Sequence, residues 1–159
     1  MGDLRRRYAV WTSMAVHAVQ EVLRDDCLGI AVYGSVARET PHDGSDIDLL
    51  VVAGRLPTGR GPRAAISSRI DETFRSVASA GAPELSSVLR TAEEMQIGFP
   101  LLLEVAADGQ IVYDPSGVLE RLLSAFRERL SERGARRVRS GDFWHWDLQG
   151  DARPGEWEI

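Results

Sequence analysis

Two acidic side chains at the start of an apolar run are the residues most suited to chemistry in this sequence. Asp46 and Asp48 flank Ile47, and the run continues through Ala53. Side chains alternate between the two faces of a strand, so both carboxylates should point to the same side. Two carboxylates held this close repel each other unless a cation lies between them. Mg²⁺ suits such a pair because it binds one or two carboxylates together with substrate phosphates.

A Gly-Ser pair ends the preceding apolar run, Leu28–Tyr33. Glycine allows the chain to turn tightly and to approach a bulky anion closely. Serine is a good N-cap, so we expect Ser35 to cap a short helix over residues 36–38, whose free N–H groups would face a phosphate. The residues predicted to contact this phosphate group are Gly34, Ser35, Arg38 and Ser45.

The combination of the two motifs is more specific than either motif alone. A lone Gly-Ser or a lone Asp-x-Asp is common, but here each lies at the end of its own apolar run, about ten residues apart. A phosphate site beside a metal-binding carboxylate pair indicates phosphoryl or nucleotidyl transfer. His42, in the loop between them, is a candidate substrate contact, although a solvated loop histidine is the favoured interpretation.

This segment resembles the signature of the DNA polymerase β-like nucleotidyltransferase superfamily, a Gly-Ser followed by Asp-x-Asp. The form of residues 34–38 and the chain length are similar to its minimal nucleotidyltransferase branch. The resemblance is strong over residues 28–53 and extends more weakly to about residue 130. It implies an α/β nucleotidyltransferase fold, Mg²⁺ as cofactor, and transfer of AMP from ATP to a hydroxyl of a small molecule or a protein.

The resemblance also implies a third acidic residue on a neighbouring strand, which here is expected over Glu84–Leu89. Glu84 and Ser86 share one face of that strand, so either could occupy the place, and with Ser86 there the acid would be missing. Glu104 is the other candidate, although a glutamate on a helix surface is its more common role. The predicted catalytic residues are therefore Asp46, Asp48 and Glu84, with Glu104 as the alternative.

A second function remains open because the third acid is uncertain. A non-catalytic nucleotide-binding module would keep the fold and act as an antitoxin that masks a partner protein. The resemblance to the minimal branch implies a HEPN-type helical toxin as that partner. The other partners that we consider are a nucleoside triphosphate, the acceptor molecule and a second copy of the chain.

Composition indicates an ordinary globular protein. The chain has 159 residues, 43% hydrophobic and 27% charged, with a net charge of −5, which argues against nucleic acid as a partner. No apolar stretch reaches the roughly 18 residues that would span a membrane. The lone Cys27 fits a reducing compartment, so we expect a cytoplasmic protein. All 19 basic residues are arginine.

Hydrophobic periodicity predicts helices over residues 4–24 and 65–78 and a third helix capped by Ser116. Apolar runs predict strands at Leu28–Tyr33, Ile47–Ala53 and Glu84–Leu89, with a short one over residues 111–114. The expected fold is α/β, with a mixed sheet of about four strands and helices mostly on one face. The arginines that follow residue 126 are expected on the solvated end of the third helix.

The C-terminal segment is unusual because three of the four tryptophans lie in it. We therefore divide the chain into a nucleotidyltransferase domain, residues 1–140, and a Trp-rich tail, residues 141–159. Large aromatic side chains are seldom left in solvent. We expect Trp144 and Trp146 to pack against the domain or against a second copy of the chain.

Overall fold

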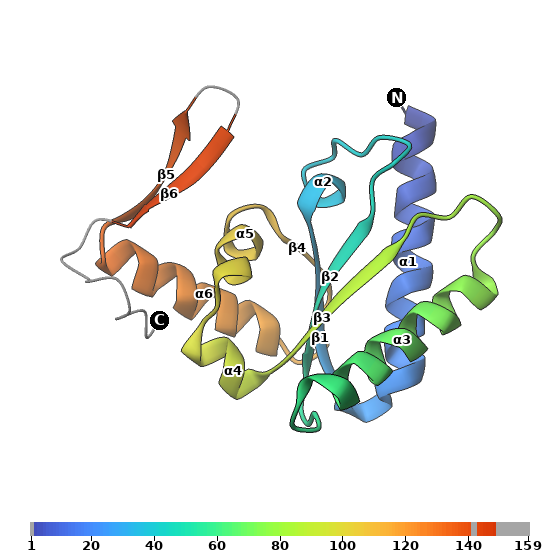
Figure 1. Cartoon of the computed structure of the whole chain (residues 1–159). Helices are drawn as coiled ribbons and strands as arrows, with labels where there is room; N and C mark the ends of the chain where they lie inside the picture. Colours follow the sequence, from blue (N-terminus) through green and yellow to red (C-terminus); the bar gives the residue numbers. More distant parts are fainter. Residues whose placement is uncertain (1, 141–142, 149–159) are drawn as a thin grey trace.

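A four-stranded mixed sheet forms the centre of the computed structural model, which describes residues 2–140 and 143–148 (Figure 1). The strand order is β3-β2-β1-β4. Strand β1 runs antiparallel to both β2 and β4, whereas β3 runs parallel to β2. The predicted α/β class and the four-stranded mixed sheet are confirmed. The strands are β1 (Cys27–Tyr33), β2 (Ile47–Ala53), β3 (Leu85–Thr91) and β4 (Gln110–Tyr113).

The pairing of β1 with β2 brings the two sequence motifs to one edge of the sheet. Tyr33, the last residue of β1, lies opposite Asp48 near the start of β2. Because the strands are antiparallel, the turn after Tyr33 and the aspartates before and within β2 must meet there. This confirms the predicted proximity of the Gly-Ser motif and the Asp-x-Asp motif.

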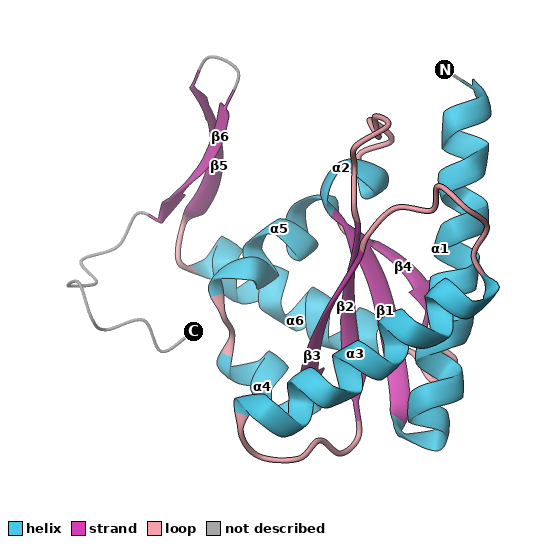
Figure 2. Ribbon diagram, turned by 45° about the vertical axis from the view of Figure 1, so that its right-hand side comes forward, coloured by secondary structure: helices cyan, strands magenta, loops and turns pink. Residues whose placement is uncertain are grey.

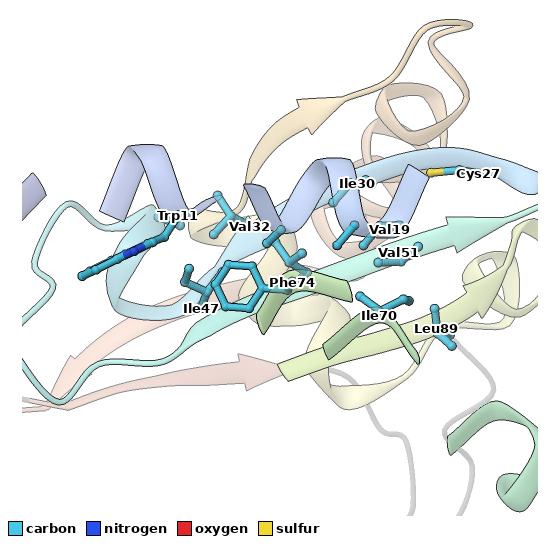
Figure 3. Close-up of a cluster of buried hydrophobic side chains, with 14 of the residues drawn as sticks. Trp11, Val19, Cys27, Ile30, Val32, Ile47, Val51, Ile70, Phe74 and Leu89 are labelled. Atoms are coloured by element: carbon cyan, nitrogen blue, oxygen red, sulfur yellow. The ribbon is translucent and has the colours of Figure 1, made fainter. Parts of the chain in front are cut away.

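Two long helices cover one face of the sheet, α1 (Gly2–Leu23) and α3 (Arg60–Val77). The apolar residues of α1 recur at three- and four-residue spacing, so a single stripe of that helix faces the strands. Figure 3 shows Trp11 and Val19 of α1 in the same cluster as Ile70 and Phe74 of α3. Ile70 and Phe74 are fully buried, so this cluster fixes the helices to β1 and β2.

Three further helices cover the opposite face, as Figure 2 shows: α4 (Ala92–Ile97), α5 (Pro100–Asp108) and α6 (Val118–Glu132). The expectation that helices pack mostly on one face is therefore wrong. Strands β1 and β2 are buried along nearly their whole length, and strands covered on both faces read as continuous apolar runs. That continuity was the sequence signal for helices on two sides.

The starts of α4 and α5 follow from local sequence. Thr91 caps α4, and its Oγ1 accepts a hydrogen bond from the backbone N–H of Glu94, while the Glu94 side chain accepts one from the Thr91 N–H. This is a capping box, which the Thr-x-x-Glu spacing of residues 91–94 favours. Pro100 lies in the first turn of α5, where its missing N–H costs no hydrogen bond. The apolar run from Leu101 is consequently helical and places Glu104 on α5.

The chain does not continue as a helix after α6. Gly134, with φ of +69°, follows the helix end at Glu132, and its N–H donates to the Ser131 carbonyl. Strand β5 (Ala135–Ser140) then pairs antiparallel with β6 (Phe143–Leu148) as a separate two-stranded sheet. The expectation that every arginine after residue 126 lies on a helix end is wrong for three of them, because β5 carries Arg136, Arg137 and Arg139.

One tryptophan of the predicted tail packs on the domain. Trp146, which lies opposite Arg137 in the β5–β6 pair, is half-buried against the apolar cluster of α4, α5 and α6. The side chain of Trp144 and residues 149–159 lie outside the described part of the chain. The boundary at residue 140 and the packing of Trp144 therefore stay predictions. Among the described residues, no helix is both long and apolar enough to cross a bilayer.

Candidate active site

At this sheet edge, the backbone of Gly34 packs against the side chain of Asp48. Gly34 has φ of +71°, and a Cβ there would lie 2.7 Å from the Asp48 Oδ2. Only glycine combines this backbone conformation with so little space. The carboxylate of Asp48 therefore lies directly against the turn that follows β1.

The turn is a four-residue helix, α2 (Gly34–Ala37), whose N-cap is Tyr33. The expectation that Ser35 is the N-cap is wrong, because the positive φ of Gly34 turns the chain one residue earlier. Ser35 lies in the first turn, where its carbonyl accepts a hydrogen bond from the Thr40 N–H at 2.9 Å. Its half-buried hydroxyl makes no hydrogen bond to the described residues, so it is free to bind a ligand.

The two aspartates differ in burial. Asp46 is exposed just before β2, whereas Asp48 is half-buried within it. Burial raises the pKa of Asp48, and the negative charges of Asp46 and Glu104 raise it further, while Arg38 acts in the opposite direction. Mutual repulsion of this kind is relieved by a bound cation. Within residues 2–140 and 143–148, no three His, Cys, Asp or Glu side chains form a metal cluster by themselves.

The register of β3 shows which side chain lies beside Asp48 on the neighbouring strand. Ser86 lies opposite Asp48, so a hydroxyl occupies the strand position next to the aspartates. Glu84 is exposed before β3, and its charge acts on Arg75 of α3. Glu104 lies on α5, which covers the face of the sheet that Asp48 shares with Leu50, and its charge raises the pKa of Asp48. Glu84 adjoins the aspartate pair through its backbone, because its carbonyl accepts a hydrogen bond from the N–H of Ile47 at 2.9 Å.

Tyr33 is a further member of the site that the sequence did not single out. Burial raises the pKa of its hydroxyl to about 12, with smaller contributions from the charges of Asp48 and Glu104. A hydrogen bond with Ser86 partly offsets this rise. Tyr33 is therefore neutral at physiological pH, and the charges of both acids act on it. It is the last residue of an apolar strand, a position that predicts only core packing.

Arg38 places a positive charge beside these acids. Its side chain is 45% exposed, and its Nη1 lies 3.8 Å from the Oδ2 of Asp108. Asp108 also accepts two hydrogen bonds from Arg137 of β5, at 2.6 and 2.7 Å. Asp108 thus lies between two guanidinium groups at the end of α5. The sequence did not single out Asp108, because an Asp-Gly pair predicts only a turn. It did not single out Arg137 either, because Arg137 lies on β5, far along the chain from both motifs.

Ser45 shapes the loop that presents Asp46. It is buried, and its Oγ accepts a hydrogen bond from the His42 N–H at 2.9 Å. The Tyr8 hydroxyl of α1 donates to the carbonyls of Ser45 and His42, at 2.6 and 3.0 Å. The His42 ring accepts a hydrogen bond from Gly44, in keeping with a loop histidine. Nucleotide contact by Ser45 stays a prediction. The sequence did not indicate the role of Tyr8 in this loop, because the spacing of Tyr8 within its helix is that of a core residue.

Comparison with known proteins finds a similarity to a nucleotidyltransferase domain over this site. Residues 18–73 match the family model described as a nucleotidyltransferase domain. That segment contains α2, both aspartates and the loop between them, so the match confirms the resemblance found in the sequence. No curated protein matches the sequence.

Solved structures are similar to this chain at low sequence identity. A spectinomycin adenyltransferase from Enterococcus faecialis, solved with ATP and spectinomycin, has a TM-score of 0.54 and 13% identity, over 78% of this chain and 67% of that chain. A toxin-antitoxin structure solved with AMP-PNP has a TM-score of 0.49 and 15% identity, over 76% and 90% of the two chains. The first of these supports the nucleotidyltransferase fold.

The raised pKa of Asp48 predicts a pH-dependent cost to stability. A carboxyl group whose pKa is higher in the folded state stabilises the fold below its unfolded pKa of about 3.9, and that contribution is lost as pH rises through the folded pKa. In chelator at pH 7, the Asp48→Asn variant should therefore melt at a higher temperature than wild type. The increase should be roughly 2–4 °C for each kcal/mol of unfavourable charge interaction that the substitution removes. The difference should vanish near pH 3.5, as thermal melts across pH would show.

Asp25→Asn is the matched control, because Asp25 is an exposed aspartate in the 3-10 helix η1 (Arg24–Asp26), which precedes β1. It should leave the melting temperature nearly unchanged. Adding Mg²⁺ should then raise the melting temperature of wild type more than that of Asp48→Asn. A variant that melts below wild type at pH 7 without metal would contradict the electrostatic account of the site.

Proposed function

We propose that this chain is a Mg²⁺-dependent nucleotidyltransferase that transfers AMP from ATP to a hydroxyl group of an acceptor. The observation that carries the proposal is the meeting of the Gly34–Ser35 turn with the Asp46–Asp48 pair at one edge of the sheet. The nucleotidyltransferase family match over residues 18–73 supports the same reaction class.

The donor set at this edge fits a magnesium ion. Asp46 and Asp48 supply carboxylate oxygens, which hard divalent cations prefer, and the remaining ligands would be substrate phosphates and water. The effect of the Asp46 charge on the pKa of Asp48 is the one expected of a pair that holds a cation. When bound, Mg²⁺ supplies charge stabilisation at the α-phosphate and the leaving pyrophosphate.

The residues around α2 would bind the triphosphate. The hydroxyl of Ser35 makes no hydrogen bond to the described residues and can donate to a phosphate oxygen. The first backbone N–H groups of α2 have no partner within that helix, so they can donate to a phosphate oxygen. Arg38, half-exposed and held near Asp108, adds a positive charge for the same phosphates.

Glu104 is the residue that we assign to activation of the acceptor. In this step its carboxylate takes the proton from the acceptor hydroxyl, the acceptor oxygen bonds to the α-phosphorus of ATP, and the bond to pyrophosphate breaks. The charge of Glu104 raises the pKa of Asp48, and Glu84 is not among the groups that act on that carboxyl. The assignment therefore favours Glu104 over Glu84.

The acceptor is a small molecule or a protein. The alternative function is a module that binds the nucleotide and masks a partner such as a HEPN-type toxin. One observation favours this alternative, namely that Ser86 rather than an acid lies beside Asp48 on β3. Transfer activity distinguishes the two functions, because masking needs no group transfer.

Nucleotide binding should depend on divalent metal and on the aspartate pair. Isothermal titration of ATP in Mg²⁺ should show binding that weakens in chelator. Asp48→Asn should lose about tenfold in metal-dependent affinity or more, which corresponds to about 1.4 kcal/mol, while Asp25→Asn should match wild type. Equal ATP affinity for wild type and Asp48→Asn in Mg²⁺ would contradict the assignment of metal and nucleotide binding to the aspartate pair.

Glu104→Gln should separate catalysis from binding. With ATP labelled in the α-phosphate, Mg²⁺ and a cell lysate as the acceptor source, the variant should transfer label about a hundredfold more slowly than wild type or worse, because general-base groups contribute on this scale. Its ATP affinity should stay close to wild type, and Glu84→Gln should keep the wild-type transfer rate.

The controls decide among the alternatives. Loss of transfer in Glu84→Gln but not in Glu104→Gln would return the catalytic role to Glu84. Tight ATP binding by wild type without any labelled product would favour the non-catalytic masking function.

A further inference from the structure

An ion pair between Asp108 of α5 and Arg137 of β5 connects the C-terminal strand pair to the candidate active site. The Nη1 and Nη2 atoms of Arg137 donate hydrogen bonds to the two carboxylate oxygens of Asp108, at 2.6 and 2.7 Å. Both side chains are partly buried, with 28% of Arg137 and 21% of Asp108 exposed. Two short, charge-assisted hydrogen bonds in parallel are geometrically specific, so they hold the Asp108 carboxylate in one orientation.

The position of β5 brings Arg137 to this carboxylate. Trp146 lies opposite Arg137 in the register of β5 and β6, so the two side chains project from the same face of the strand pair. Trp146 is half-buried against the cluster of α4, α5 and α6, and Asp108 is the last residue of α5. Figure 1 shows β5 and β6 apart from the central sheet, at the end of α6. A separate part of the fold therefore supplies a charge to the end of α5.

Arg38 is the second cation beside Asp108. Its Nη1 lies 3.8 Å from the Oδ2 of Asp108, which is too long for a hydrogen bond. Among the described residues, Arg38 and Arg137 are the cations that pair with Asp108. Both oxygens of the carboxylate already accept hydrogen bonds from Arg137. The half-exposed guanidinium of Arg38 consequently keeps its donors for another acceptor.

The charges on α5 show the same division between the two arginines. Glu104 lies four residues before Asp108, so the two acids share one face of the helix. The hydrogen bond with Asp108 raises the pKa of Arg137, burial lowers it, and the charges of Asp108 and Glu104 raise it further. Arg137 is therefore a countercharge for both acids, which weakens their attraction for Arg38.

We propose that Arg137 is a positioning residue for nucleotide binding, because its pairing with Asp108 keeps Arg38 free for the triphosphate. Without Arg137, the Asp108 charge would be uncompensated in a partly buried position, which is unfavourable. Arg38 would then close the remaining distance to Asp108, and the phosphates would compete with this carboxylate for the same guanidinium. The role rests on the proposed function, since it assumes that Arg38 binds ATP phosphates.

Titration of ATP in Mg²⁺ into single and double variants tests this role. Arg137→Gln should bind ATP roughly fivefold more weakly than wild type, the scale of one partly exposed ion pair. Asp108→Asn should bind ATP no more weakly than wild type, because it removes the competing carboxylate itself. Adding Arg137→Gln to Asp108→Asn or to Arg38→Gln should cause no further loss. Arg133 is exposed at the end of α6, so Arg133→Gln removes the same charge as a matched control and should bind ATP as wild type does.

The Asp108→Asn variant separates positioning from two simpler explanations. Arg137→Gln and Asp108→Asn both break the contact between β5 and α5, so a merely structural role of this contact predicts similar losses of ATP affinity in the two variants. A direct effect of the Arg137 charge on ATP predicts that Arg137→Gln costs the same affinity with and without Asp108. Either result would overturn the proposal.

A measurement without nucleotide distinguishes this proposal from the proposed function. A guanidinium held by two hydrogen bonds rotates slowly, so its side-chain N–H signals are resolved in spectra of ¹⁵N-labelled protein. The Arg38 signals, assigned by their loss in Arg38→Gln, should be averaged in wild type, resolved in Arg137→Gln, and averaged again when Asp108→Asn is added.

The two measurements decide different claims. Arg38 signals that stay averaged in Arg137→Gln would overturn the positioning role, whether or not ATP binds. Wild-type protein that binds no ATP would contradict the proposed function, and the Arg38 signals would still decide whether Arg137 keeps Arg38 away from Asp108.

Discussion

The contact between the Gly34 backbone and the Asp48 carboxylate is the constraint on which the site depends. A Cβ at position 34 would lie 2.7 Å from the Asp48 Oδ2, so the turn after β1 packs directly on an acidic side chain. This is possible because β1 and β2 are antiparallel and pair Tyr33 with Asp48. The same contact puts the Ser35 turn and the aspartate pair within reach of one bound molecule.

This arrangement concentrates charge at the sheet edge. Asp46 and Glu104 both raise the pKa of Asp48, and only Arg38 opposes them among the groups that act on it. Repulsion between acids in a partly buried position lowers the stability of the fold, and such repulsion is common in binding sites. A cation and a triphosphate would relieve it, because the metal neutralises the carboxylates and Arg38 faces the added phosphate charge.

The sequence predicts the local features well, because they rest on short-range chemistry. The alternation of Asp46 and Asp48, the apolar runs of β1 and β2, and the capping box at Thr91 all follow from neighbouring residues. The third acid could not be placed in this way. The candidates for it depend on the register of β3, which puts Ser86 beside Asp48, and on α5, which covers the face of the sheet that Asp48 shares with Leu50. The contacts of Arg137 with Asp108 and of Tyr8 with Ser45 span 29 and 37 residues, so no local pattern could reveal them.

A crystal structure of the full chain with Mg²⁺ and a non-hydrolysable ATP analogue tests the central claim most directly. The account predicts a metal ion between the carboxylates of Asp46 and Asp48, triphosphate oxygens on the Ser35 hydroxyl and the α2 backbone, and Glu104 facing the α-phosphate. A nucleotide bound elsewhere on the fold, or bound at this edge with no metal on the two aspartates, would contradict it.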